Sequence, residues 1–78
     1  MTTFVFVSFT GSAVGGNISL PDLKVGDLVL AITDTTNPLS DFRSNFAKLV
    51  FTDGEFYQAP ADFSALTFEA LFQREVVI

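Results

Sequence analysis

Residues 46–58 read Phe-Ala-Lys-Leu-Val-Phe-Thr-Asp-Gly-Glu-Phe-Tyr-Gln and hold the clearest local signal in the chain. An Asp-Gly pair between two runs of β-forming residues is typical of a type I′ turn, whose twist suits paired antiparallel strands. We therefore predict a β-hairpin with Asp53 and Gly54 at its tip. The predicted register places Thr52 opposite Glu55, Phe51 opposite Phe56 and Val50 opposite Tyr57.

The N-terminal residues 3–10 show the alternation of a strand with two apolar faces. One face carries Val5, Val7 and Phe9, and the other carries Phe4, Phe6 and Ser8. We expect one face to meet the core and the other to meet a partner. This alternation, together with the lack of a basic N-terminal region, favours a strand over a signal peptide.

The next segments are short and divided by turn residues. Residues 18–20 predict a brief strand that ends at Pro21, because proline cannot donate to a β-ladder. Gly26 is expected to supply a positive φ to a turn over residues 24–27. The continuous apolar run at 28–33 predicts a fully buried central strand.

Two segments are open to both helix and strand. Phe42, Phe46, Leu49 and Val50 fall at helical spacing, but no Glu or Gln completes a capping box. For residues 41–50 we favour an irregular or single-turn segment to Asn45, followed by a strand.

The last segment, residues 64–78, contains good helix formers but also alternates like a strand. We favour a long C-terminal strand, with a helix over residues 64–74 as the alternative. In the strand, one face would carry Phe68, Ala70, Phe72, Val76 and Ile78, with Arg74 as the one charged residue in the row.

These segments together predict an all-β fold. Short strands separated by turn signals every 8–12 residues are typical of a small sandwich or barrel. We predict a single domain over residues 1–78, a small antiparallel β-sandwich or barrel of about six strands, with or without one short helix.

The composition predicts self-association. Ten phenylalanines and 49% hydrophobic residues in 78 positions leave more apolar surface than a small monomer can bury. Without cysteine or histidine, the chain cannot use a disulfide and is a poor candidate for a structural zinc site. We expect a homo-oligomer, with a trimer favoured. The interface candidates are Phe4, Phe6, Phe68, Phe72, Arg74 and Ile78.

Arg74 has two interpretations. It pairs with an acidic residue of a neighbouring subunit, since arginine is favoured at interfaces, or it is an edge residue whose charged end reaches solvent.

The charge and the missing residue types exclude several functions. A net charge of −5 with four basic residues argues against binding to nucleic acid. No stretch approaches the length of about 20 apolar residues needed for membrane insertion. Most nucleophile and base pairs require histidine or cysteine. We therefore expect no enzyme activity, no catalytic residue, no metal and no cofactor.

The order of segments resembles that of small all-β structural proteins of tailed bacteriophages. It runs from residues 17–30 through a Thr/Asn loop and the hairpin from Phe51 to Tyr57 to a last strand over residues 62–72. The resemblance implies a virion accessory protein, associated with the tail or tail fibre or decorating the head. It also implies synthesis in the host cytoplasm and contacts with other virion proteins. It carries over no site residue.

Two alternatives stay open. The chain could be a ligand-binding or glycan-binding module at a fibre tip, with Phe42, Tyr57 and Phe63 as the contact residues, because aromatic rings stack on sugars. It could also be a small phage-encoded inhibitor of a host protein, an interpretation that rests on analogy.

Overall fold

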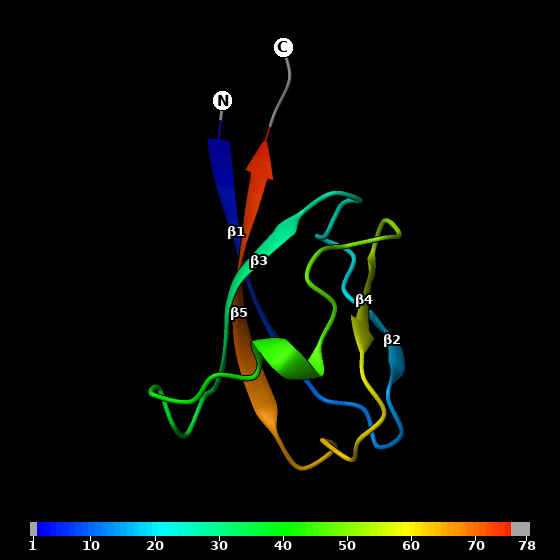
Figure 1. Cartoon of the computed structure of the whole chain (residues 1–78), viewed down its shortest axis with the longest axis vertical. Coiled ribbons are helices and arrows are strands. Elements are labelled where there is room, and N and C mark those ends of the chain that lie inside the picture. The colour runs from blue at the N-terminus through cyan, green and yellow to red at the C-terminus, as the bar shows by residue number, and fades with distance from the viewer. Residues whose placement is uncertain (1, 76–78) are drawn as a thin grey trace.

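The computed structural model describes residues 2–75, which form two antiparallel sheets on either side of one core (Figure 1). The larger sheet has the order β1-β5-β3, with strands Thr2–Thr10, Thr67–Glu75 and Leu28–Asp34. The smaller sheet pairs β2, Gly16–Ser19, with β4, Glu55–Gln58. Among the described residues the one helical element is a single 3-10 turn, η1, Arg43–Asn45. The all-β prediction is confirmed.

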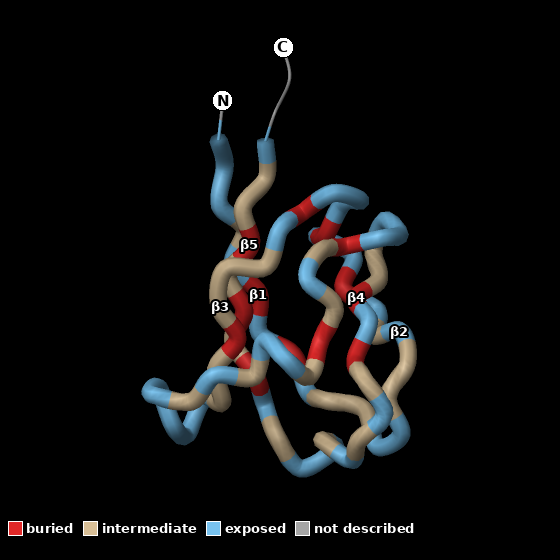
Figure 2. The backbone as a smooth tube through the Cα atoms, in the orientation of Figure 1, coloured by how far each residue is buried: buried red, intermediate tan, exposed pale blue. Residues whose placement is uncertain are grey.

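Strand β5 lies at the centre of the larger sheet and pairs with both β1 and β3. Its alternate residues Phe68, Ala70 and Phe72 are buried, as the predicted C-terminal strand required. Strand β1 is also confirmed, with Val7 and Phe9 in the core and Phe4 and Phe6 exposed. Figure 2 shows exposed backbone at the N-terminal end of β1 and buried positions where the sheets face each other. The predicted positions Val76 and Ile78 lie outside the described residues.

Strand β3 is an edge strand, so the prediction of a fully buried central strand is wrong. Only Ile32 is buried in it. A β-bulge shifts the register between Val29 and Ala31. Val29 and Ile32, three positions apart, therefore both lie on the core side, opposite Phe72 and Ala70. The bulge interrupts the alternation of faces along β3, so the continuous apolar run does not require burial on both faces.

The Asp53-Gly54 turn forms, but its geometry and the register of the segment before it differ from the prediction. Thr52 bridges to Glu55 as expected, and the Glu55 amide donates to the Thr52 carbonyl at 3.1 Å. Gly54 has φ of 77°, whereas no residue other than glycine among those described has a positive φ, so the turn is not type I′. The predicted pairing of Phe51 with Phe56 is also wrong, because the segment before the turn rejoins β4 only where Phe46 bridges Gln58 and the Ala47 amide donates to the Tyr57 carbonyl at 3.0 Å. The other edge of β4 pairs with β2.

The reason for this change of register is the burial of Val50. Its side chain is in the core, its amide donates to the Asp27 carbonyl at 2.8 Å, and its carbonyl accepts from the Gly26 amide at 2.8 Å. The segment before the turn is thereby held by the loop that precedes β3. Phe51, the next residue, is left 68% exposed. The single-turn prediction for residues 41–45 is confirmed by η1, but the strand expected after it does not form.

The core consists mainly of phenylalanine rings from both sheets. Phe56 of β4 meets Phe9 of β1 and Phe72 of β5 edge to face, with ring centroids 6.2 and 5.1 Å apart. Phe46 stacks on Phe56 at 5.4 Å, with 4° between the ring planes. The contacts of Phe56 with Phe9 and Phe72 join the two sheets, since these two ring pairs span the space between them.

A buried amide fixes the loops at one end of the core. The Gln58 side chain is completely buried and accepts from the Ser12 amide at 2.8 Å. It donates to the Ser12 carbonyl at 3.0 Å and to the Ala61 carbonyl at 2.9 Å. Three hydrogen bonds satisfy most of its capacity and tie the loop after β1 to the loop after β4.

Candidate functional site

The candidate site is the face of the three-stranded sheet that points away from the core, which we call the outer face. Directly opposed residues of an antiparallel sheet share a face. Phe6 lies opposite Leu71, which lies opposite Ala31, and Phe4 lies opposite Gln73, which lies opposite Leu28. The outer face thus comprises Thr2, Phe4, Phe6, Ser8, Thr10, Leu28, Ala31, Thr33, Thr67, Glu69, Leu71, Gln73 and Glu75.

The outer face exposes large apolar side chains. Phe4 is 61% exposed and Phe6 is 62% exposed on β1, and Leu28 is 43% exposed on β3. Leu71 of β5 lies half-buried between them. A contiguous group of exposed apolar side chains is typical of a contact surface. The composition predicted a surplus of apolar surface, and the sheet places part of it on this face. Within the described residues, the other large apolar side chains that are exposed lie elsewhere, at Val14, Val25, Leu39, Phe51 and Tyr57.

Strand β1 is a free edge of the sheet. It pairs with β5 on one side, and within residues 2–75 no other backbone pairs with it. The opposite edge of the sheet is covered, because the Val29 amide donates to the Lys48 carbonyl at 3.0 Å and the Phe42 amide donates to the Ile32 carbonyl at 2.9 Å. A groove of about 260 Å³ borders β1 at Phe6, Val7 and Ser8, with Leu20, Pro21 and Asp22 as its other wall.

The polar groups of this edge can be assigned to individual residues. The Gly11 amide donates to the Leu66 carbonyl at 3.0 Å and continues the β1–β5 ladder. Because the amide and carbonyl direction alternates along an antiparallel strand, the odd residues of β1 bond to β5. The residues that direct their amides and carbonyls to the free edge are therefore Thr2, Phe4, Phe6, Ser8 and Thr10.

The features that normally protect an edge strand are absent from β1. Its sequence, Thr-Thr-Phe-Val-Phe-Val-Ser-Phe-Thr, contains no charge and no proline, and its pairing with β5 has no bulge. Natural proteins use such features to prevent association through exposed edges. A nine-residue edge without them is available for strand pairing.

The other interface candidates lie elsewhere. Phe68 and Phe72 are completely buried in the chain's own core, so they are not available for an interface, because their side of β5 faces the smaller sheet. Ile78 lies outside the described residues. The sequence analysis missed Leu71, although it is the one apolar residue in the polar row of the last strand.

Arg74 bonds within its own chain, which corrects the expectation of a partner on a neighbouring subunit. Its Nε donates to Asp27 Oδ1 at 2.8 Å, and its Nη2 donates to Asp27 Oδ2 at 2.7 Å and to the Asp22 carbonyl at 2.9 Å. Asp27 also accepts from the Lys24 amide at 2.9 Å. The hydrogen bonds from Arg74 hold the pKa of Asp27 below its usual value, although burial opposes them.

The ligand-binding candidates do not form an exposed aromatic group. Phe42 and Phe63 are half-buried and pack on Phe68, with ring centroids 4.9 and 5.6 Å from it. They meet each other edge to face at 5.8 Å. Tyr57 alone is well exposed, on β4, at 44%. The first two candidates extend the core, because each ring finds a neighbouring ring to contact.

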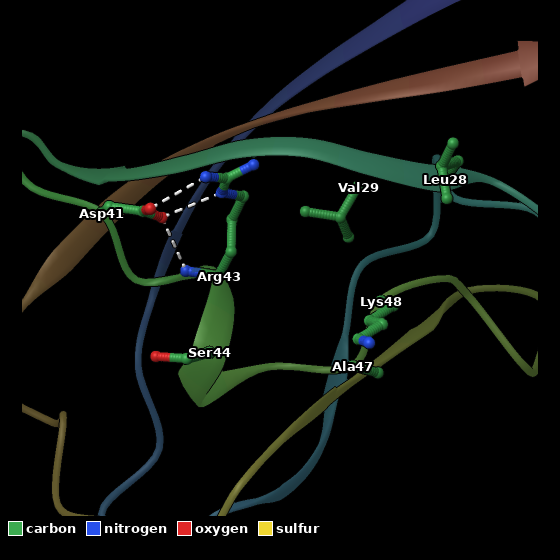
Figure 3. A pocket seen from close by; sticks show the side chains of 7 residues that line it. All are labelled: Leu28, Val29, Asp41, Arg43, Ser44, Ala47 and Lys48. Atoms are coloured by element: carbon green, nitrogen blue, oxygen red, sulfur yellow. Dashed lines mark hydrogen bonds and ion pairs between the residues drawn. The ribbon is translucent and has the colours of Figure 1, made fainter.

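A second, larger groove of about 440 Å³ lies between β3 and residues 41–48 (Figure 3). Leu28, Val29 and Ala47 line it together with Asp41, Arg43, Ser44 and Lys48. Arg43 binds Asp41 at one end, its Nε donating to Oδ1 at 3.0 Å and its Nη2 donating to Oδ2 at 2.9 Å. These bonds lower the pKa of Asp41 to about 2, so the two charges neutralise each other at neutral pH. No sequence signal indicated this groove, because it forms only when η1 packs beside β3.

Within residues 2–75, no group of three or more His, Cys, Asp or Glu side chains is placed to hold a metal ion. In the same residues, no helix is long and apolar enough to cross a membrane. Comparisons with protein-family models, with curated proteins and with solved structures give no match to this chain.

Proposed function

We propose that the chain is a non-enzymatic structural component of a tailed-phage virion that assembles as a symmetric multimer through its outer face. The observation that carries the proposal is the exposed apolar row on that face beside an unpaired strand edge. Location on the tail, on the tail fibre or on the head follows from the resemblance in sequence order.

The exposed phenylalanines would contribute a driving force for association. A phenylalanine side chain buries roughly 150–250 Å², so Phe4 and Phe6 at 61% and 62% exposure leave roughly 200 Å² per copy in contact with water. At about 25 cal/mol per Å², its burial contributes about 5 kcal/mol per copy, before the costs of association.

The glycan-binding alternative receives less support from the geometry. A fibre-tip module would present aromatic rings on its loops, whereas Phe42 and Phe63 pack against Phe68. Tyr57 is the one candidate left for stacking on a sugar. The outer face exposes a larger apolar surface than this single ring.

The test is the absolute mass in solution, measured by light scattering after gel filtration over a range of concentrations. We expect the natural chain to form a multimer at micromolar concentration. The variant Phe4→Ser/Phe6→Ser should shift toward the monomer while remaining folded, because both side chains are exposed and neither belongs to the core.

The matched control is Phe51→Ser. Phe51 is 68% exposed but lies outside every strand, so its loss should leave the mass unchanged. A natural chain that stays monomeric throughout this range would overturn the assembly proposal. Mass spectrometry of purified virions tests the phage part, and absence of the chain from them would refute it.

A further inference from the structure

We propose that two copies of this chain pair through their β1 edges, antiparallel, about a two-fold axis at Phe6. The two three-stranded sheets would then form one continuous six-stranded sheet. This inference rests on the proposed function and adds a contact between strand edges to the contact through the outer face.

The symmetry restricts the possible registers. In a two-fold contact, pairing is reciprocal. If one residue of the first copy faces a second residue of the other copy, that second residue in the first copy faces the first residue in the other. A register centred on Phe6 uses all nine residues of β1 and keeps the outer faces of the two copies on the same side. It places Phe6 opposite Phe6 of the second copy, Phe4 opposite Ser8 and Thr2 opposite Thr10.

The free polar groups fit the same register. All five residues that direct amides and carbonyls to the edge have even numbers, and this register pairs even residues with even residues. Each such pair exchanges two hydrogen bonds, as expected for the closely bonded pairs of an antiparallel ladder. Two-fold registers centred on Val5 or Val7 leave Thr10 or Thr2 without a partner. The register at Phe6 is the one that satisfies the whole edge.

Charge within β1 does not oppose a second copy as the occupant. Each chain has a net charge of −5, so most contacts between two copies would bring acidic groups together. Strand β1 carries no charge, and pairing it with itself adds no like-charge contact within the new ladder.

The free edges favour a two-fold pair over a ring. A trimer built by strand pairing would need a second long edge to receive β1. The β3 edge is bonded to Phe42 and Lys48, and β2 has only four residues. The same edge of a second copy is the remaining nine-residue partner in the described part of the chain.

Amide hydrogen exchange of the natural chain, followed by NMR at low and high concentration, tests the pairing. The amides of Phe4, Phe6 and Ser8 should gain at least about tenfold protection on association, because only the second copy bonds them. The amides of Val5 and Val7 bond to β5 and should be protected at both concentrations. Protection that includes both Thr2 and Thr10 would distinguish the Phe6 register from its neighbours.

Single cysteines give an independent test, because the natural chain contains none. Under mild oxidation, Phe6→Cys should crosslink to itself, since opposed Cα atoms lie about 5.5 Å apart. Ser8→Cys alone should not, because two copies of that position are separated by four residues, or about 13 Å, along the ladder. A mixture of Phe4→Cys with Ser8→Cys should give the crosslinked heterodimer.

The outcomes separate this inference from the proposed function. A multimer in which Phe4, Phe6 and Ser8 amides stay unprotected would overturn the edge pairing and leave assembly through the outer face standing. Crosslinking of Ser8→Cys to itself in preference to the mixed pair would also overturn the register. A monomer at all concentrations would overturn both proposals.

Discussion

Arg74 on the central strand β5 donates two parallel hydrogen bonds to Asp27 in the turn before β3, with N–O distances of 2.8 and 2.7 Å. The Asp27 side chain is 1% exposed and the Arg74 side chain is 27% exposed. The same carboxylate accepts a hydrogen bond from the Lys24 amide. Arg74 therefore compensates the charge of Asp27 and also stabilises the turn that contains it. The guanidinium of Arg74 therefore forms its ion pair within its own subunit.

Breaking this pair should destabilise the fold. Arg74→Met leaves a buried carboxylate without its cation, a change that typically costs about 3–5 kcal/mol, and the partial exposure of Arg74 places the expected loss near the lower limit. The double variant Asp27→Asn/Arg74→Met should recover part of the loss, because it also removes the buried charge. Urea unfolding monitored by circular dichroism measures both.

The control for this prediction is Asp41→Asn. Asp41 binds Arg43 with the same two-bonded geometry, but both side chains are 57% exposed. Its loss should leave the unfolding midpoint nearly unchanged. A larger loss of stability for Asp41→Asn than for Arg74→Met would contradict the expectation that the buried ion pair stabilises the fold more than the exposed one.

Stability should fall in acid, in part through Asp27. Its pKa in the folded chain is lowered from the ordinary value of 3.8, so the folded state binds fewer protons than the unfolded state in this range. The contribution of Asp27 is complete above about pH 4 and is lost as the pH falls through the lowered pKa. Asp27→Asn should flatten the dependence of the unfolding free energy on pH below pH 4, whereas an unchanged slope would show that Asp27 titrates normally.

Truncation of the core aromatic cluster should have a large effect. Phe68 contacts four other rings, with centroids between 4.9 and 5.6 Å, and its side chain is completely buried. Phe68→Ala should cost about 3–5 kcal/mol, the usual range for a buried phenylalanine. Phe51→Ala, at an exposed position, should change thermal stability little. Equal losses for both variants would refute the placement of the core.

Alanine substitutions at two adjacent glycines distinguish the effect of backbone strain from that of a steric clash. Both have positive φ, 85° at Gly15 and 96° at Gly16, so alanine is strained at either position by about 1 kcal/mol. A Cβ at Gly15 would also lie 2.8 Å from the Pro60 Cα, whereas a Cβ at Gly16 would meet nothing within 4 Å. Gly15→Ala should therefore lower the melting temperature clearly more than Gly16→Ala. The reverse order would show that the loop after β4 does not approach Gly15 in this way.

Elements defined by local alternation could be predicted from the sequence. β1 and β5 form where period-two patterns place Val7, Phe9, Phe68 and Phe72 on the core side. Gly26 has φ of 93°, as its place in the turn indicated. The surplus of apolar residues also predicted an exposed apolar surface, because that inference depends on composition and chain length alone.

The partners of each segment were decided by tertiary structure. Residues 46–52 alternate well enough for a strand, yet Val50 is bonded by Gly26 and Asp27, so β4 pairs fully with β2 and meets this segment only near Phe46. The Leu28–Asp34 run lies at an edge because β5 occupies the centre.

The same distinction applies to the candidate site. The sequence by itself determined that apolar faces exceed what the core can hold. Only the fold decided that Phe68 and Phe72 fill the core while Phe4 and Phe6 face solvent beside an unpaired edge. Local pattern fixes which residues share a face, but contacts between residues far apart in the chain decide which face is covered.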